Sequence, residues 1–323
     1  MAVRRLKVIE IADETQLIRR IVLAAEDGCA LPGFTAGAHI AVHAPGVGPR
    51  KYSLVETADF AAPKTCTLGI RREDGGQGGS RWMHALKLGD VVETEAPENN
   101  FALAAGSGRV TLVAGGIGIT PLLSMAAELK AQGRPFRLIY AARAREEFAF
   151  LPDLRKIAGD ALNLHADEEA GKVLAIDALL DSCASDEQLY ICGPRPMIAA
   201  ASDGAKARGW GPGRLHCELF FSAAAEPSAA HSGGDTAFEV ELASTGRVVQ
   251  VPADKTILDA LIEAGVDPLH DCDRGECGVC QVGVIEGAPD HRDHLLNEAE
   301  REAGKLIQIC VSRAKSSRLK LDL

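Results

Sequence analysis

Aromatic side chains and positive charge are both scarce in this sequence. Phe, Trp and Tyr make up 4% of its 323 residues, and 35 Lys and Arg residues stand against 45 Asp and Glu, a net charge of −10. A chain with excess negative charge is a poor match for nucleic acid or for an anionic membrane, which are bound through clustered cations. We therefore expect neither of them as a partner.

Long hydrophobic runs are missing too. The uncharged stretch from Val110 to Met125 is interrupted by glycines and by Pro121, unlike a membrane-spanning helix of about 20 apolar residues. The first ten residues, MAVRRLKVIE, contain neither the apolar core nor the small-residue cleavage site of a secretory signal. We expect a soluble, cytoplasmic protein that is a monomer.

Nine cysteines form an odd set for a disulfide framework, and four of them are spaced in a recognisable way. Cys272, Cys277 and Cys280 follow the pattern C-x4-C-x2-C, and Cys310 stands further along the chain, which is the spacing of a plant-type [2Fe-2S] ferredoxin. A structural zinc site is the alternative, although such sites usually contain two closely spaced pairs. Four of the remaining cysteines, at positions 29, 66, 183 and 217, are predicted to be small buried apolar residues.

The order of apolar runs predicts several domains. Six short β-like runs in the first hundred residues predict an antiparallel barrel or sandwich, and from Arg109 an alternation of strands and helices predicts a parallel sheet. The stretch from Ser222 to Thr236 is rich in Ala, Ser and Gly and is typical of a linker. We therefore predict domains over 1–103, 104–223 and 236–323, with a linker over 224–235.

A glycine-rich turn marks a candidate nucleotide site in the second domain. Residues 115–121, GGIGITP, follow a buried strand and open a helix, where backbone N–H groups and the helix dipole favour a phosphate. Residues 192–197, CGPRPM, follow another buried strand and should lie at the same carboxyl edge of the sheet. Steric packing alone is the other explanation for these glycines, and a buried packing role is the other explanation for Cys192.

The first domain contains a second candidate site. Residues 50–54, RKYSL, begin a predicted strand, and GGQGGS at 75–80 precedes a helical run. Tyr52 can cover a flat ring system, Arg50 can bind a phosphate through two hydrogen bonds, and Ser53 can bond a ring heteroatom. Taken singly, these residues are also typical of ordinary strands and helix caps.

Together these motifs resemble the ferredoxin-NADP reductase superfamily. RKYSL resembles its flavin motif, GGIGITP and CGPRPM resemble its pyridine-nucleotide motifs, and the cysteine pattern resembles a fused plant-type ferredoxin. This order of domains resembles that of the phthalate dioxygenase reductase-like group, which includes vanillate O-demethylase and carnitine monooxygenase reductases. The resemblance also covers the DHRDHLL run that ends at Leu296 and the C-terminal CVSRAKSSRLKLDL. It implies an antiparallel flavin-binding β-barrel, a nucleotide-binding α/β domain with a parallel sheet, and a C-terminal β-grasp ferredoxin.

The resemblance assigns roles residue by residue. The residues that would contact the flavin ring or its phosphate are Arg50, Lys51, Tyr52, Ser53, Ile70, Arg71, Arg72, Gly78, Gly79, Ser80, Thr120 and Phe220. Those that would face the pyridine nucleotide are Gly115, Gly116, Gly118, Ile119, Pro121, Arg143, Asp167, Gly193, Pro194, Pro196 and Met197. The hydride-transfer site would comprise Ser53, Thr120 and Cys192, and the cluster ligands would be Cys272, Cys277, Cys280 and Cys310.

The resemblance favours FMN over FAD, because the group's named member uses FMN and no aromatic residue suited to stacking on an adenine is evident at the flavin site. It also favours NADH over NADPH. Asp167 and Glu168 could repel the 2′-phosphate of NADPH, whereas the nearby Arg143 and Arg145 keep NADPH open.

We therefore expect an oxidoreductase that passes electrons from NADH through FMN and a [2Fe-2S] cluster to a Rieske non-haem iron oxygenase or demethylase. The alternatives are an NAD(P)H reductase with FAD that serves a different acceptor, and an iron-sulfur module that senses redox state. The C-terminal module, residues 236–323, contains 10 Lys and Arg and 16 Asp and Glu, so it holds −6 of the net charge. This excess could steer it toward a basic partner or could simply be a solvated surface.

Overall fold

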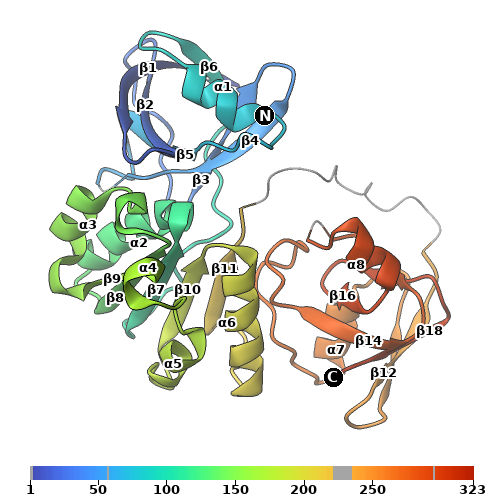
Figure 1. Cartoon of the computed structure of the whole chain (residues 1–323). Helices are drawn as coiled ribbons and strands as arrows, with labels where there is room; N and C mark the ends of the chain where they lie inside the picture. The colour runs from blue at the N-terminus through green and yellow to red at the C-terminus, as the bar shows by residue number, and fades with distance from the viewer. Residues whose placement is uncertain (1–2, 57, 221–234, 294) are drawn as a thin grey trace. The chain divides into compact units, whose positions relative to one another are not determined.

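The computed structural model describes residues 3–56, 58–220, 235–293 and 295–323, coloured along the chain in Figure 1. These residues divide into two compact units. The first comprises residues 3–197 and Phe220, and the second comprises residues 198–219 and 235–323. The units are described in turn.

The first unit begins with an antiparallel sheet of six strands in the order β4-β3-β6-β1-β2-β5. The strands are β1 (Arg4–Asp13), β2 (Ile18–Ala25), β3 (His39–Ala44), β4 (Gly48–Ser53), β5 (Thr65–Arg71) and β6 (Val91–Thr94). A bridge between Leu54 and Leu68 joins the two edges of this sheet, so it closes into a barrel. Apolar side chains that alternate along the strands fill the interior, and α1 (Gly79–Ala85) contributes Met83 to it.

The rest of the first unit is an α/β domain. Four parallel strands stand in the order β10-β7-β8-β9, with bounds β7 (Val110–Gly115), β8 (Phe136–Ala142), β9 (Leu162–Ala166) and β10 (Gln188–Cys192). Their connections contain α2 (Ile119–Ala131), α3 (Leu151–Ala158), α4 (Asp167–Ala170) and α5 (Ile176–Asp181), with short 3-10 turns at η1 (Gly116–Gly118), η2 (Arg145–Glu147) and η3 (Gly159–Ala161). Strand β7 is buried along its whole length, which explains its unbroken apolar sequence.

The barrel and the α/β domain share one hydrophobic core. Ile18, Ala36 and Val55 from the barrel pack in the same cluster as the buried side chains of β7 and α2. This shared core packs the barrel against β7 and α2, and the glycine turn of the nucleotide motif lies between these two elements.

The second unit contains a mixed five-stranded sheet in the order β13-β12-β18-β14-β16. Strands β12 and β18 are parallel and the other pairs are antiparallel. Its elements are β12 (Phe238–Leu242), β13 (Val248–Val251), α7 (Ile257–Glu263), β14 (Gln281–Glu286), β15 (Pro289–Asp290), α8 (Glu298–Ala303), β16 (Leu306–Gln308), β17 (Arg313–Ala314) and β18 (Arg318–Leu321). Helix α7 packs its apolar face on this sheet, and the core reaches Cys280 and Cys310.

Two elements of the α/β domain also fall largely into the second unit by their contacts. These are α6 (Arg195–Ala207), from Ile198 onward, and β11 (Leu215–Glu218). They therefore accompany the C-terminal sheet in the unit that holds the four-cysteine motif.

The predicted fold class is confirmed: an antiparallel flavin-type barrel, a parallel α/β sheet and a mixed ferredoxin-type sheet occur in the predicted order. One prediction was wrong in part. Cys66 and Cys217 are buried, but Cys29 is exposed in a turn and Cys183 is only half-buried, because both lie in loops outside the cores. No helix in the described part of the chain is long and apolar enough to cross a membrane.

Candidate cofactor sites

The barrel motif and the glycine-rich loop of the first domain lie side by side. Arg50, Lys51, Tyr52 and Ser53 are the last four residues of β4, and Gly78, Gly79 and Ser80 form the start of α1. A Cβ atom added to Gly79 would lie only 2.9 Å from Cγ of Arg50, so the helix start is held against the Arg50 side chain. Arg50 donates hydrogen bonds to Pro49 O and to Oε1 of Gln77. The structure thus places a guanidinium at the N-terminal turn of a helix, a combination that suits a phosphate.

Ser53 and Tyr52 lie deeper in the same strand. The hydroxyl of Ser53 is buried and has no hydrogen-bond partner among the described residues. A buried polar group without a partner is costly, so this hydroxyl fits a ligand atom that would bond to it. Burial raises the pKa of Tyr52 to about 12, which keeps its ring neutral. Lys51 is exposed.

Strand β5 places the next predicted flavin residues beside the helix that carries Thr120. A Cβ atom added to Gly69 would lie 2.7 Å from Cγ2 of Thr120 and 2.9 Å from the Phe150 ring. Ile70 is buried, whereas Arg71 and Arg72 at the end of the strand are exposed, and Arg72 pairs with Asp74. Gly69 of β5 therefore lies against Thr120 of α2, whereas the neighbouring Ile70 packs in the core of the barrel.

An ion-pair network that the sequence reasoning missed joins the barrel to the α/β domain. Oε1 of Glu14 accepts from Nε of Arg20 at 2.6 Å, and Oε2 accepts from the backbone N of Phe150 at 2.8 Å. Arg20 also pairs with Asp153 and lies over the Phe150 ring. Phe150 has a φ of 59°, a left-handed conformation that is uncommon outside glycine. No sequence signal points to the bond between Glu14 and Phe150, because the two residues are 136 positions apart.

The glycine turn and the CGPRPM segment meet at the carboxyl ends of β7 and β10. A Cβ atom on Gly118 would lie 2.0 Å from the carbonyl O of Cys192, and one on Gly115 would lie 2.6 Å from Cδ of Pro194. A Cβ atom on Gly193 would lie 2.9 Å from Sδ of Met197. Close backbone packing therefore explains these three glycines, which is the steric explanation that the sequence left open.

Gly116 differs from its neighbours. Its φ is +55° and a Cβ atom there would meet nothing within 4 Å, so the backbone of this turn faces open space. The turn leads into α2, whose first residues, Ile119, Thr120 and Pro121, are buried. The open backbone at a helix start is suited to an anion.

Cys192 is the last residue of β10 and is fully buried next to Gly118. Pro194 and Pro196 are exposed at the start of α6, and Met197 is half-buried between Gly115 and Gly193. The structure therefore brings the two nucleotide motifs into one cluster, with Cys192 in its floor.

Two predicted nucleotide residues lie together at the ends of the next strands. Arg143 follows β8 and is exposed, and its backbone O accepts from the N of Glu168 at 3.0 Å. Asp167 opens α4 and lies 3.2 Å from Nε2 of His165. Arg145, in contrast, forms two hydrogen bonds with the Glu169 carboxylate, at 2.6 and 2.7 Å.

The four cysteines of the second unit form two pairs. Sγ of Cys280 lies 3.2 Å from Sγ of Cys310, and the backbone N of Cys277 donates to Sγ of Cys272 at 3.3 Å. Hydrogen bonds from the Cys277 thiol and from backbone N–H groups lower the pKa of Cys272 to about 6. A thiol that ionises readily is a good metal ligand.

The pairing favours a two-iron cluster over a single zinc ion. A structural zinc site gathers four ligands around one ion, whereas a [2Fe-2S] cluster with four cysteine ligands is larger and has two metal atoms. The donor chemistry and the two thiol pairs therefore fit the cluster.

Residues of α6 and β11 contact both ends of the three-cysteine loop. The Asp271 carboxylate, directly before Cys272, accepts from the backbone N of Cys217 at 2.9 Å and hydrogen bonds to Nδ1 of His216 at 3.1 Å. Directly after Cys280, the carbonyl O of Gln281 accepts from Nζ of Lys206 at 2.6 Å. In the structure the Asp271 carboxylate is an internal acceptor.

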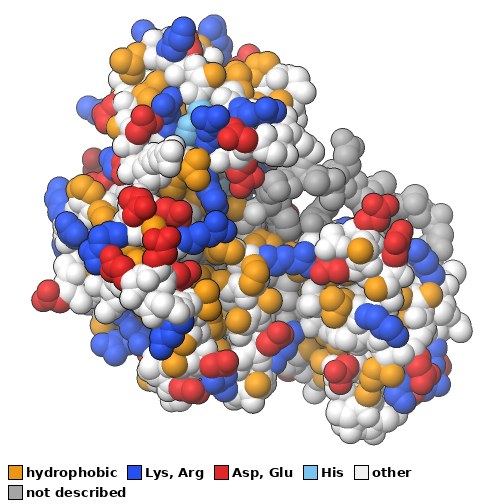
Figure 2. Space-filling view, viewed as in Figure 1, with side chains coloured by type: hydrophobic (Ala, Val, Ile, Leu, Met, Phe, Trp, Pro, Cys, Tyr) orange, Lys and Arg blue, Asp and Glu red, His pale blue; other side chains and the backbone are white. Residues whose placement is uncertain are grey.

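Other acidic residues of the loop are at the surface. Asp267 and Asp273 are exposed, and Glu276 is half-buried and pairs with Arg274. Acidic and basic side chains are interspersed over the visible face of the C-terminal domain (Figure 2).

The remaining predicted flavin residue, Phe220, is 39% exposed and is the last described residue before the predicted linker. Most of the predicted linker lies outside the described residues.

Comparison with known families matches two parts of the chain. Residues 240–315 match the 2Fe-2S iron-sulfur cluster binding domain, and residues 112–203 match the oxidoreductase NAD-binding domain. These segments contain the four cysteines and the two glycine-containing nucleotide motifs described above.

Full-length relatives are similar over nearly the whole chain. The phenoxybenzoate dioxygenase subunit beta of Ectopseudomonas oleovorans is 40% identical, covering 93% of this chain and 90% of its own. The vanillate O-demethylase oxidoreductase of Pseudomonas sp. strain HR199 is 41% identical, covering 92% of both chains.

A solved structure shows the same arrangement of domains along the chain. Phthalate dioxygenase reductase, described as a modular structure for electron transfer from pyridine nucleotides to [2Fe-2S], is 33% identical with a TM-score of 0.65. The match covers all of this chain and 98% of that one.

Proposed function

Because this chain belongs to the phthalate dioxygenase reductase-like family of oxygenase reductases, we propose that it takes electrons specifically from NADH, uses FMN as its flavin and serves a Rieske-type oxygenase or demethylase. As a member of that family it is a flavin- and iron-sulfur-containing oxidoreductase that draws on a pyridine nucleotide. When bound, the flavin accepts a hydride, which carries two electrons, and releases them singly to the one-electron cluster. We also propose that it works in the cytoplasm, where NADH is available.

FMN is supported by the geometry at the start of α1. Arg50 and the backbone of Gly79 and Ser80 provide one compact cradle, which suits a terminal phosphate. The buried Ser53 hydroxyl would bond a heteroatom of the flavin ring, and the neutral Tyr52 ring would cover the ring face. Ile70 and Thr120 would line the ring from β5 and α2.

NADH is supported by the charges around β8 and β9. The Glu169 carboxylate accepts two hydrogen bonds from the guanidinium of Arg145, so the positive charge of this arginine is paired with a negative one. Asp167, at the start of α4, would repel a 2′-phosphate. Gly116 and the start of α2 would receive the pyrophosphate, and Cys192 would lie beneath the nicotinamide.

The four cysteines would hold the cluster as two pairs, Cys272 with Cys277 and Cys280 with Cys310. The three-domain division over 1–103, 104–223 and 236–323 assigns one cofactor to each domain. An oxygenase partner is supported by the relatives, which are components of dioxygenase and demethylase systems.

The single observation that carries the FMN proposal is the contact between Arg50 and the start of α1. Arg50→Ala should lose most of the bound flavin, and the flavin extracted from the wild-type protein should be FMN by chromatography. Arg5→Ala, which removes an exposed arginine of the same barrel, should keep the flavin. Stoichiometric FMN in Arg50→Ala, or extracted FAD, would contradict the proposal.

The exit through the cluster is tested separately. In Cys277→Ser, reduction of cytochrome c or of a Rieske oxygenase should be lost, whereas bleaching of the flavin by NADH should persist. Cys29→Ser, at an exposed cysteine outside the motif, is the control and should behave as wild type. If Cys277→Ser still passes electrons from NADH to a small-molecule acceptor, the acceptor takes electrons directly from the flavin. If the steady-state rate of electron transfer to the protein acceptor is also unchanged, the result favours a sensing role for the cluster.

A further inference from the structure

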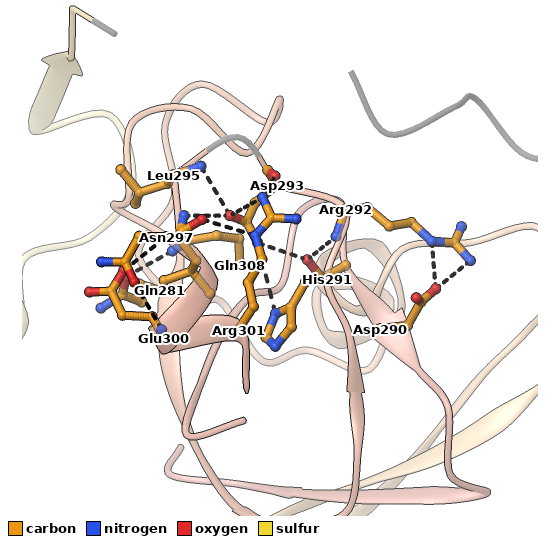
Figure 3. A network of polar contacts seen from close by, with 12 residues as sticks. Gln281, Asp290, His291, Arg292, Asp293, Leu295, Asn297, Glu300, Arg301 and Gln308 are labelled. Carbon is orange, nitrogen blue, oxygen red and sulfur yellow. Dashed lines mark hydrogen bonds and ion pairs between the residues drawn. The ribbon is translucent and has the colours of Figure 1, made fainter. Parts of the chain in front are cut away.

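The DHRDHLL segment contains a carboxylate that is completely buried. The side chain of Asp293 has no exposed surface. Its Oδ2 accepts from the backbone N of Leu295 at 3.0 Å and of Leu296 at 2.7 Å, and Arg301 approaches it at 3.6 Å (Figure 3). Two backbone donors hold the carboxylate in one orientation, as in a turn closed by an aspartate.

The segment that contains Asp293 and Leu295 packs closely against the three-cysteine loop, residues 272–280. A Cβ atom added to Gly275 would lie 3.0 Å from Cα and 3.1 Å from Cβ of Asp293. A Cβ atom on Gly278 would lie 2.7 Å from Cδ2 of Leu295. Gly275 and Gly278 stand between the three clustered cysteines, so the backbone that curls around the cluster rests on the Asp293 turn.

Asp293 also reaches the segment that supplies the fourth cysteine. The Ser312 hydroxyl, two residues after Cys310, donates to Oδ1 of Asp293 at 3.5 Å and accepts from the backbone N of Arg292 at 3.1 Å. A Cβ atom on Gly275 would also meet Val311, at 2.6 Å. Asp293 therefore contacts both parts of the chain that would carry the cluster ligands: its Cα and Cβ lie against Gly275, and its carboxylate accepts from Ser312.

The neighbouring charges only partly balance this carboxylate. Arg292, the adjacent arginine, directs its guanidinium to Asp290 and Asp235 instead, at 2.5 to 2.9 Å. Arg301 donates to the carbonyl oxygens of Asp293 and Leu296, and the Arg301–carboxylate separation of 3.6 Å is longer than a direct hydrogen bond. Nδ1 of His291 lies 3.9 Å away, and burial lowers the pKa of His291, which favours its neutral form.

We propose that Asp293 is a positioning residue for the [2Fe-2S] cluster: it holds the three-cysteine loop against the Cys310 segment, and its buried charge lowers the reduction potential of the cluster. This rests on the proposed ligation by the four cysteines. Reduction adds one electron to the cluster, and a fixed negative charge that water does not screen disfavours the more negative state.

The test is a redox titration of the holoprotein, followed by the electron paramagnetic resonance signal of the reduced cluster. Asp293→Asn removes the charge and keeps one acceptor oxygen for the backbone N–H groups. Its potential should rise by about 59 mV, a tenfold change in the equilibrium constant of a one-electron couple. Asp293→Glu, which keeps the charge, should restore a potential close to that of the wild type.

Asp290→Asn is the matched control, because it removes the same charge from the same segment. Asp290 is partly exposed and pairs with Arg292 (Figure 3), and it is not among the nearest neighbours of Gly275, which are Val311 and Asp293. Screening by solvent and salt should limit the effect of Asp290→Asn to about a twofold change in the equilibrium constant for one-electron reduction of the cluster. Equal shifts of the cluster's reduction potential in Asp293→Asn and Asp290→Asn would overturn the proposal. A reduction potential that is unchanged in Asp293→Asn would also overturn it.

A second variant keeps the proposal testable if Asp293→Asn does not fold. Ser312→Ala removes a neutral hydrogen bond to the carboxylate and leaves the charge in place, so the potential should move slightly lower and never higher. A higher potential in Ser312→Ala would overturn the proposal. The failure of the proposed ligation would look different, because Cys277→Ser would then retain the wild-type resonance signal.

Discussion

Replacing Gly118 by alanine adds one methyl group at the point where the two nucleotide motifs touch. The new Cβ atom would lie 2.0 Å from the carbonyl O of Cys192 and 2.9 Å from the backbone N of Gly193. Both neighbours are backbone atoms, so no side-chain rotation can relieve the contact. Ordinary van der Waals contact begins near 3.4 Å, so one segment must move by about 1.4 Å.

That movement has two expected consequences. Overpacking of a buried site costs about 1 to 3 kcal/mol of stability. Cys192 ends β10 and pairs with Ala114 of β7, so the displacement would alter the floor of the proposed nicotinamide site. A misplacement of about 1 Å can lower the rate of a reaction that depends on orientation by about 100-fold.

The assay is stopped-flow reduction of the bound flavin by NADH in a single turnover, with the flavin content measured in parallel. Gly118→Ala should retain its flavin, because Arg50, Ser53 and the start of α1, which would hold the flavin phosphate and ring, lie in the barrel, and it should be reduced about 100-fold more slowly. Gly211→Ala is the control, since a Cβ atom there meets nothing within 4 Å. Reduction of Gly118→Ala at close to the wild-type rate would refute the close packing and its link to hydride transfer.

Three further perturbations follow from the structure. Glu14→Gln weakens charge-assisted bonds to Arg20 and Phe150, so the first unit should lose about 1.5 to 3 kcal/mol, measured by thermal unfolding with flavin release; an unchanged midpoint would contradict this role. Glu169→Gln frees Arg145, so kcat/KM for NADPH should rise several-fold relative to NADH, and an unchanged ratio would count against the assignment. Burial raises the pKa of the Tyr52 hydroxyl to about 12, above its value in the unfolded chain. The free energy of unfolding that this shift contributes is therefore complete below pH 10 and is lost between pH 10 and 12. Urea unfolding should show this loss of stability in the wild type but not in Tyr52→Phe.

Most β-strands of the barrel were predictable because they are short apolar runs between turn residues; β4, with the sequence GPRKYS, is the exception. Five of the six predicted runs match strands closely, the run KYSLVE overlaps β4 only at 51–53, and the helix expected after GGIGITP spans Ile119–Ala131. These elements are decided by local periodicity and by glycine and proline, which act over a few residues. The prediction for Cys29 failed because a lone cysteine carries no local pattern that reports its burial.

Contacts between distant segments could not be predicted in the same way. Glu14 bonds to Phe150, and Asp271 bonds to the backbone of Cys217, yet nothing in either carboxylate's local sequence identifies its partner. Asp293 belongs to a run of histidines and aspartates that was noticeable in the sequence. Its role as a buried acceptor between two cysteine-bearing segments depends on the closure of the fold.

By itself, the sequence determined the order of the barrel, the parallel α/β sheet and the ferredoxin-type sheet, and the [2Fe-2S] type of the cluster, because these follow from cysteine spacing and local apolar patterns. Only the tertiary structure decided that the thiols stand as two pairs, that Gly118 rests on the carbonyl of Cys192, and that Asp293 carries a buried charge between two ligand segments. The physical reason is that packing and electrostatics depend on distances through space, and a linear sequence does not contain those distances until the cores close.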